Sequence, residues 1–131
     1  MSQENVEILR RGYEGYNRTG EFELELFDPD GVWDNSNAVF DPAVYRGLDG
    51  VRAFLSSLRD MWKQVRLEPE EFIVVDENRV IVPTRIVSTG REDVQTIAHN
   101  ANLFTLRGGK ITYAKAFQTK ADALEAAGLR E

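Results

Sequence analysis

Residues 94–118 read VQTIAHNANLFTLRGGKITYAKAFQ, and this stretch decides the fold. Two alternating runs flank the pair Gly108-Gly109, a pattern typical of two antiparallel strands joined by a tight turn. Side chains alternate between the two faces of a strand, so Asn100 and Asn102 share one face with Phe104. Amides among large apolar groups on one sheet face suggest a lined pocket rather than a plain core.

The same alternation sorts the rest of this hairpin into two faces. On the first strand, one face carries Ala98, Asn100, Asn102, Phe104 and Leu106, and the other carries Ile97, His99, Ala101, Leu103 and Thr105. On the last strand, Thr112, Ala114, Ala116 and Gln118 lie opposite Ile111, Tyr113, Lys115 and Phe117. Small residues such as Ala114 and Ala116 leave volume either for a ligand or for a helix that packs closely against the sheet.

Two amphipathic helices are predicted before the hairpin. Apolar residues recur at helical spacing from Val6 to Tyr16, which predicts a first helix with Ser2 as its N-cap. A second apolar stripe predicts a helix over residues 49–64, with Asp49 as its N-cap. Residues 21–27 between them alternate like a strand but are rich in good helix formers.

Short strands and turns account for the remaining segments. DPDG at 28–31 predicts a turn that leads into a strand at 32–36. Pro83 predicts an edge or a bulge in its strand, and the tail at 121–129 predicts a short helix. Helices followed by an antiparallel sheet predict one α+β domain over residues 1–131. Its four main strands are predicted at 71–75, 79–89, 94–107 and 110–118.

Composition limits the function. Cysteine is absent, which excludes disulfides, thiolate nucleophiles and Cys-type metal sites, and a single histidine leaves no metal constellation. The net charge of −6 argues against nucleic acid, because no basic surface is available to neutralise phosphates. The start lacks a signal-peptide pattern, and no apolar run is long enough to span a bilayer. We therefore expect a cytoplasmic protein with no metal or nucleotide cofactor and no membrane partner.

Five segments that follow one another in order point to a family. ENVEILRRGYEGYNRTGEFE, FDPDGVW, VYRGLDGVRAFLSSLRDMWKQVRLEPEEF, LFTLRGGKI and ADALEAAGL together resemble the SnoaL-like branch of the superfamily related to nuclear transport factor 2. The resemblance implies a cone, in which a curved antiparallel sheet wraps around helices and holds a pocket in its wide end. It also implies a short helix within 21–27, and it places Asn102 and Ala114 on the inside.

The resemblance further implies a homodimer formed through the outer face of the sheet. The apolar residues assigned to that face favour the same pairing, since they would otherwise meet water: Leu103, Ile111, Tyr113 and Phe117. The family includes polyketide cyclases, ketosteroid isomerase-like enzymes, epoxide hydrolases and non-enzymatic modules. The fold alone therefore does not select a function.

Catalytic candidates come from the ketosteroid isomerase-like members, which use a helix tyrosine and two carboxylic acids. The resemblance places these groups at Tyr13, Asn35 and Asn102, so both acids are amides in this chain. An amide can donate to an oxyanion but cannot accept a proton at neutral pH, which disfavours isomerisation by that route. Asp34 and Asp41 are weaker candidates for a base.

The expected ligand site combines aromatic side chains with amides. Aromatic residues on amphipathic helices suit either a ligand site or an ordinary core, and the two strand amides need either protein or ligand partners. His99 is expected on the outer face, away from the site. The candidate ligand-binding residues are Tyr13, Tyr16, Trp33, Asn35, Phe54, Leu58, Trp62, Asn100, Asn102, Phe104, Ala116 and Gln118.

Two functions remain open from the sequence. The first is a protein that binds a small, mostly apolar, cyclic molecule in the cone and, as an enzyme, would be a cyclase, isomerase or hydrolase that acts by polar positioning. The second is a non-catalytic dimeric interaction module with a packed or water-filled interior. Convergence of Tyr13, Asn35 and Asn102 on one volume would favour the first, and amides bonded only to protein would favour the second.

Overall fold

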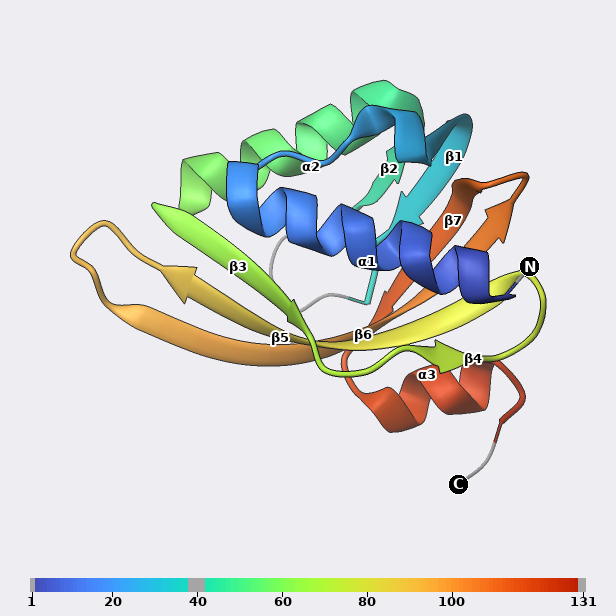
Figure 1. Cartoon of the computed structure of the whole chain (residues 1–131). Helices are drawn as coiled ribbons and strands as arrows, with labels where there is room; N and C mark the ends of the chain where they lie inside the picture. The colour runs from blue at the N-terminus through green and yellow to red at the C-terminus, as the bar shows by residue number, and fades with distance from the viewer. Residues whose placement is uncertain (1, 38–41, 130–131) are drawn as a thin grey trace.

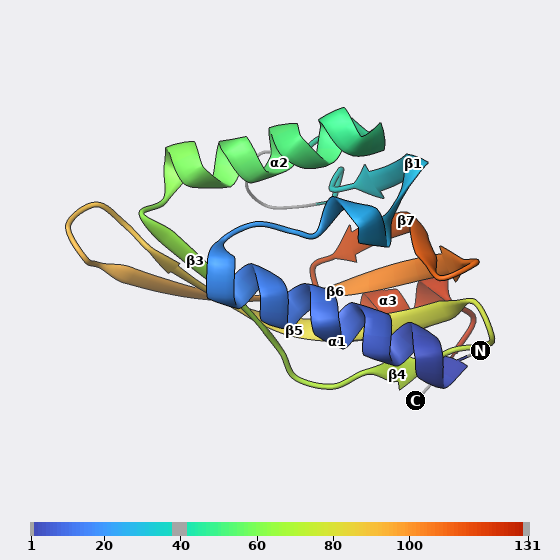
Figure 2. The same ribbon diagram turned by 45° about the horizontal axis from the view of Figure 1, so that its top comes forward.

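The structure, a computed structural model, describes residues 2–37 and 42–129. Helices α1 and α2 lie over one face of a curved sheet, and α3 lies on the other face (Figures 1 and 2). This arrangement is the α+β cone that the sequence predicts. The elements in chain order are α1 (Ser2–Thr19), η1 (Leu24–Leu26), β1 (Phe27–Asp34), β2 (Val44–Arg46), α2 (Gly47–Met61), β3 (Gln64–Pro69), β4 (Ile73–Val74), β5 (Arg79–Thr89), β6 (Gln95–Arg107), β7 (Lys110–Phe117) and α3 (Lys120–Ala126).

Within the described residues, seven strands form one sheet in the order β2-β1-β7-β6-β5-β3, with β4 paired to β5. The long central pairing of β5 with β6 and the hairpin of β6 with β7 are antiparallel, as predicted. The pairing of β1 with β7 is parallel, so the sheet is mixed rather than antiparallel throughout. The parallel pair arises because the chain crosses the whole sheet between the two strands.

Helix α1 is fastened to the sheet at both ends by asparagine side chains. Near its start, the Asn5 Nδ2 donates to the Glu77 carbonyl at 2.8 Å. Near its end, Asn17 donates to the Leu67 carbonyl at 2.7 Å and accepts from the Leu67 N–H at 2.8 Å. Asn17 thus replaces a strand partner at the edge of β3, which protects that edge from pairing with another chain.

The helix ends differ from those predicted. Ser2 is the first residue of α1 rather than its N-cap. Helix α2 begins at Gly47, whose φ of +67° suits glycine, so Asp49 lies inside the first turn instead of capping it. It ends at Met61 rather than at residue 64, because Gln64 already belongs to β3. Long-range pairing with β5 therefore wins over local helical propensity here.

The DPDG sequence lies inside β1 instead of preceding a strand at 32–36. The register of β1 against β7 shifts between Phe27 and Val32, so these residues bulge out of the ladder. The Asp28 carboxylate accepts the Asp30 N–H at 2.8 Å, which forms the local turn. The turn signal is correct, but the strand continues on both sides of it.

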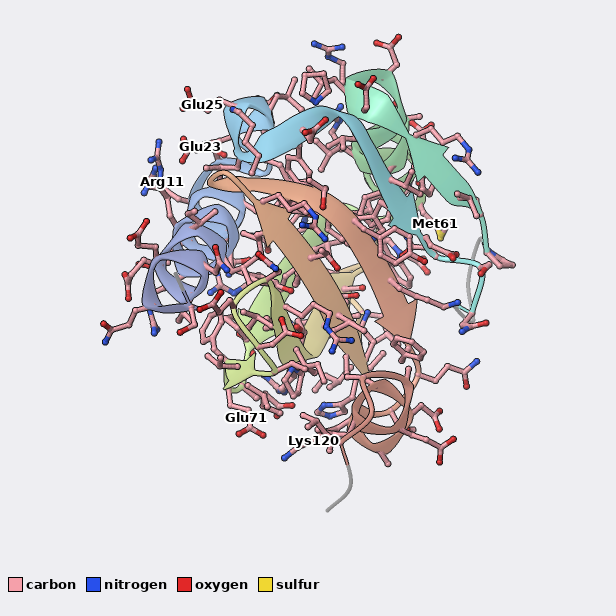
Figure 3. The ribbon with its side chains drawn as sticks, turned by 90° about the vertical axis from the view of Figure 1, so that its right-hand side faces the viewer. Arg11, Glu23, Glu25, Met61, Glu71 and Lys120 are labelled. Atoms are coloured by element: carbon pink, nitrogen blue, oxygen red, sulfur yellow. The ribbon has the colours of Figure 1, made fainter. Side chains whose placement is uncertain are left out.

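The segment at 21–27 contains a single turn, η1, as the predicted short helix. Arg11 on α1 holds this turn, since its guanidinium lies 2.6 Å from a carboxylate oxygen of Glu23 and 3.3 Å from one of Glu25 (Figure 3). These contacts are exposed to solvent and contribute little to stability individually. They align the chain as it leaves α1 and enters β1.

Strands β3 and β4 are the least predictable part of the sheet. No strand is predicted at 64–69, where β3 lies, and the strand predicted at 71–75 shortens to Ile73–Val74. Both strands pair with β5, one on each side of Pro83. Pro83 lacks an N–H and lies opposite the break between β3 and β4, so neither strand pairs with it there, in agreement with the predicted local edge or bulge.

Helix α3 covers part of the outer face of the sheet. Two of the apolar residues expected to pair with a second copy, Leu103 and Phe117, therefore pack against α3 instead. Leu103 is buried beneath it, and Phe117 packs against the same cluster. The Lys120 ammonium lies 2.6 Å from the Glu71 carboxylate and ties α3 to the chain before β4 (Figure 3). The outer cluster consists of Ile81, Ala101, Leu103, Ala123, Leu124 and Ala127.

Ile111 lies on the inner face of the sheet, whereas the alternation along β7 predicts the outer face. The register of β6 against β7 shifts after Thr105, which pairs with Tyr113, while Leu106 pairs with Ile111. This irregularity turns Ile111 into the inner cluster beside Leu106. The other tested assignments on β6 are correct, since Phe104 belongs to the inner cluster and Ala101 to the outer one.

Candidate functional site

Tyr13, Thr84 and Asn102 meet beneath the helices on the inner face of the sheet. They come from α1, β5 and β6, and their exposed fractions are 6%, 1% and 6%. The Tyr13 hydroxyl lies 3.4 Å from the Thr84 hydroxyl, and the Asn102 Nδ2 donates to the Tyr13 oxygen at 3.3 Å. Two of these residues are sequence-predicted candidates, and the structure brings them into direct contact.

The Val82 carbonyl fixes which atom donates in each hydrogen bond of this group. The Thr84 hydroxyl lies 3.1 Å from the Val82 carbonyl, which can only accept, so Thr84 donates its one proton there. Thr84 must then accept from Tyr13, and Tyr13 accepts in turn from the Asn102 amide nitrogen. We call this series, Asn102 to Tyr13 to Thr84 to the Val82 carbonyl, the inner hydrogen-bond chain.

Tyr13 is neutral at physiological pH. Burial raises the pKa of its hydroxyl, and the hydrogen bonds with Thr84 and Asn102 offset only part of that increase. A neutral tyrosine can orient a ligand or donate a hydrogen bond, but it does not act as a base. Asn35 and Asn102 are amides, so Tyr13, Asn35 and Asn102 together offer no general base.

Three buried polar atoms have no hydrogen-bond partner in the described part of the protein. They are the acceptors Asn100 Oδ1 and Asn102 Oδ1 on the inner face of β6, and the donor Nε1 of Trp33, which belongs to the inner cluster. An unpaired buried polar atom costs about 1–3 kcal/mol, so three are a substantial cost to the fold. Their cost is offset if another molecule supplies the missing partners.

Asn35 is buried but does not join the inner hydrogen-bond chain. Its backbone N–H donates to the Ala43 carbonyl at 2.8 Å. It follows Asp34, which pairs with Lys115 on β7, so it lies beside Ala116. Among residues 2–37 and 42–129, no hydrogen bond links Asn35 to Tyr13 or Asn102. The convergence of all three candidates is therefore only partial.

Aromatic rings fill much of the space beside the inner hydrogen-bond chain. Phe104 makes an edge contact with Tyr13 at 6.2 Å between ring centres and another with Trp33 at 5.9 Å. Trp33 also lies 5.2 Å from Phe54. Tyr16, predicted to line the pocket, stacks on Phe22 at 4.8 Å. A cavity of about 10 Å³ between β1, α2 and β7 has room for one water molecule at most.

The inner face of β6 opens towards the turn that joins it to β5. Asn102 is buried, Asn100 and Ala98 are half-buried, and Thr96 is exposed. On α2 and just after it, the predicted lining residues Leu58 and Trp62 are half-buried as well. A ligand that reaches Asn100 and Asn102 would therefore approach from this end of the sheet.

Several predicted residues lie away from the inner face. Gln118 is exposed and donates to the Asn37 carbonyl at 3.0 Å. His99 lies on the outer face as predicted, with its Nδ1 3.7 Å from a Glu70 carboxylate oxygen. Asp41 falls outside the described residues.

Asp34 lies on the outer face rather than beside the inner hydrogen-bond chain. Its carboxylate accepts from the Tyr113 hydroxyl at 3.3 Å and lies 3.7 Å from the Lys115 ammonium. Hydrogen bonds from Ser36, followed by the charge of Lys115, lower the pKa of this carboxyl. A carboxylate of lowered pKa on the opposite face cannot serve as the base of the inner site.

Thr84 belongs to the site but is not among the residues that the sequence predicts for it. It lies two residues after Val82 in an apolar strand, so its hydroxyl shares the buried face with the side chain of Val82. A hydroxyl on the buried face of an apolar strand is the available signal, because it requires a partner.

In the described part of the chain, no group of three or more metal-ligating side chains occurs. No described helix is long and apolar enough to cross a bilayer.

Comparisons with known proteins agree with this architecture. A family model, that of the SnoaL-like domain, matches residues 9–114. The structure of TerC co-crystallized with polyporic acid is 21% identical, with a TM-score of 0.75, and the match covers 95% of this chain and 98% of that one. No curated protein matches the chain.

Two further solved structures resemble the chain. A ketosteroid isomerase-like protein from Catenulispora acidiphila, in complex with trimethylamine, is 17% identical, with a TM-score of 0.74 and coverage of 95% and 94%. A candidate SnoaL-like polyketide cyclase from Jannaschia sp. CCS1 is 19% identical, with a TM-score of 0.73 and coverage of 96% and 92%. At these identities the likeness shows the fold.

Proposed function

Because this chain belongs to the SnoaL-like domain family, we propose that it binds a small, mostly apolar, cyclic molecule on the inner face of its sheet. The observation that carries the proposal is the group of unpaired buried atoms at Trp33, Asn100 and Asn102. Apolar walls with a few convergent polar atoms are the usual composition of a small-molecule site. The half-buried end of β6, at Asn100 and Ala98, is the entrance.

The structural neighbours support a small organic ligand. One was crystallised with polyporic acid and another with trimethylamine, so the same fold holds small organic molecules in other proteins. Neither compound is assigned to this chain.

Any reaction in this site proceeds by orientation of the ligand rather than by proton transfer from the three candidate groups. Tyr13 is neutral, and Asn35 and Asn102 are amides, which act neither as acids nor as bases at neutral pH. Amides and a hydroxyl can hold a ligand oxygen or a water molecule in a reactive position. A cyclase-like or hydrolase-like activity fits this chemistry better than isomerisation does.

A second function, a non-catalytic dimeric module, is favoured by a different observation. The contacts of Trp33 with Phe54 and Phe104 fill the interior in this conformation, and the cavity beside Trp33 holds no more than a water molecule. In that case ordered water serves the unpaired atoms. The homodimer would use the outer face of the sheet beyond α3, where Ile97 is 52% exposed.

Proton–nitrogen correlation NMR distinguishes the two functions. The chain has two tryptophans, so the spectrum has two indole signals, and Trp33→Phe assigns them. A library of cyclic ketones, lactones, epoxides and phenols should shift the indole signal of Trp33 in a saturable way. Trp62 is half-buried just after α2, next to the residue that bonds to the end of β5, so it reports on entry at that end of the sheet. A Trp33 signal that no compound moves would contradict ligand binding and favour the module.

A further inference from the structure

We infer that the site takes a ligand bearing a hydroxyl group that donates to Asn102 Oδ1, and that Thr84 determines this preference by orienting the amide. The inference rests on the proposed ligand-binding function and names its ligand class: hydroxylated rings such as phenols and enols. It follows from the direction of the inner hydrogen-bond chain together with the buried atoms that remain unpaired.

Thr84 sets the orientation of the Asn102 amide through Tyr13, without contacting the amide itself. The Thr84 proton is used by the Val82 carbonyl, so the Tyr13 proton is used by Thr84, and Tyr13 can offer Asn102 only an acceptor. Asn102 must therefore turn its nitrogen towards Tyr13, at 3.3 Å. Its oxygen remains as a buried acceptor with no donor among the described residues.

A second acceptor strengthens the same preference. Asn100 Oδ1 is also buried and unpaired, and it lies on the same strand face two residues away. The third unpaired atom, Trp33 Nε1, is a donor. A hydroxyl group both donates and accepts, so it can serve either kind of atom, whereas a ketone, ether or epoxide only accepts and leaves the amide oxygens unpaired.

The fit is tested with three matched probes: β-naphthol, its methyl ether, and methyl naphthyl ketone. They share one aromatic skeleton and differ in the presence of a donor. Because an unpaired buried acceptor is costly, calorimetric titration of the full chain should show β-naphthol binding about tenfold more tightly than the ether or the ketone. Equal binding of all three would overturn the inference while leaving ligand binding intact. Binding of none, with no shift at Trp33, would contradict the proposed function itself.

The role of Thr84 is tested by Thr84→Val, which keeps the shape of the side chain and removes the hydroxyl. Tyr13 then loses its acceptor and donates to the Asn102 oxygen instead, so the amide turns and presents its nitrogen to the ligand. The preference for β-naphthol over the ketone should fall from about tenfold to near unity, chiefly through tighter binding of the ketone. A purely structural role would weaken all three probes alike.

A matched control and a second variant complete the test. Thr105→Val makes the same chemical change on the opposite face of β6, where Thr105 pairs with Arg79, and should leave the preference unchanged. Tyr13→Phe frees the amide by a different route and should also reduce the preference, which keeps the test decisive if Thr84→Val folds poorly. A preference unchanged in both Thr84→Val and Tyr13→Phe would overturn the assigned role of Thr84.

Discussion

Replacing Tyr13 with phenylalanine tests the inner hydrogen-bond chain without disturbing the packing around it. The ring keeps its edge contacts with Phe72 at 6.4 Å and Phe104 at 6.2 Å. Only the hydroxyl is lost, and with it the contacts to Thr84 and Asn102. The side chain is 6% exposed, so water has little access to the groups left behind.

The expected loss can be worked from these contacts. Each hydrogen bond contributes about 0.5–1.5 kcal/mol net, and the distances of 3.3 and 3.4 Å place both at the weak end. Together they contribute about 1 kcal/mol. Asn102 would then have neither amide atom paired to protein, which adds about 1 kcal/mol. Tyr13→Phe should therefore lower the free energy of unfolding by about 2 kcal/mol, or Tm by about 8 °C.

Urea denaturation at neutral pH measures this loss, and Tyr16→Phe is the control. Tyr16 lies one helical turn away on the same helix and stacks on Phe22, but no hydrogen bond of its hydroxyl occurs among the described residues. It should lose less than about 0.5 kcal/mol. A double-mutant cycle of Tyr13→Phe with Thr84→Val should give a coupling energy of about 0.5–1 kcal/mol.

The pH dependence provides a second readout. Burial raises the pKa of Tyr13 in the folded state, so the unfolded chain loses this proton first as the pH rises past about 10. The contribution of Tyr13 is fully present below that pH and is lost as the pH rises towards the folded-state pKa. The difference between wild type and Tyr13→Phe should shrink above pH 10 or so. Two results would refute the inner hydrogen-bond chain. One is a stability loss in Tyr13→Phe no larger than that in Tyr16→Phe, and the other is a stability difference between wild type and Tyr13→Phe that does not change with pH.

Four further substitutions test the packing and the charges of the fold. Leu124→Ala should lower the free energy of unfolding by about 2–4 kcal/mol, because this residue fills the cluster under α3; a loss below about 1 kcal/mol would contradict that packing. Gly12→Ala should be neutral or stabilising by up to about 1 kcal/mol, since a Cβ there meets a leucine side chain at an ordinary 3.5 Å. Gly50→Ala, in the other long helix, should destabilise, because a Cβ would lie 2.8 Å from the backbone of β2; equal effects of the two substitutions in thermal melts would contradict this difference. Hydrogen bonds from a nearby serine lower the pKa of Asp34, so its contribution to stability is present above about pH 4 and is lost as the pH falls through its folded-state pKa. Asp34→Asn should reduce the loss of stability in acid, and an unchanged acid-unfolding curve would be inconsistent with that shift.

Local sequence patterns were sufficient for much of this protein. The bounds of β5 at residues 79–89 are those predicted, and β6 and β7 differ from prediction by one residue each. Alternation along β6 also placed Asn102 and Phe104 on the inner face. These features follow from the neighbours of each residue along the chain, because a strand repeats every two residues wherever it lies.

Features that depend on register were decided only in three dimensions. Ile111 reaches the inner cluster because the hairpin register shifts before it, and β3 exists because β5 offers it a partner. Neither event has a local signal of its own. The irregularity reverses the face of Ile111 at the turn end of β7, whereas Ala114 keeps its predicted inner face, so periodicity alone misplaces the residue beside the irregularity.

The candidate site shows the same division most clearly. The sequence by itself determined that Asn102 is an amide and Tyr13 a hydroxyl, which disfavours isomerisation by a pair of carboxylic acids. Only the tertiary structure brought in Thr84, which is 71 positions from Tyr13 in the chain. The direction of a hydrogen bond depends on the last acceptor in the series, the Val82 carbonyl, and that partner is chosen by folding. The tertiary structure thus decides which atom of Asn102 remains free for a ligand.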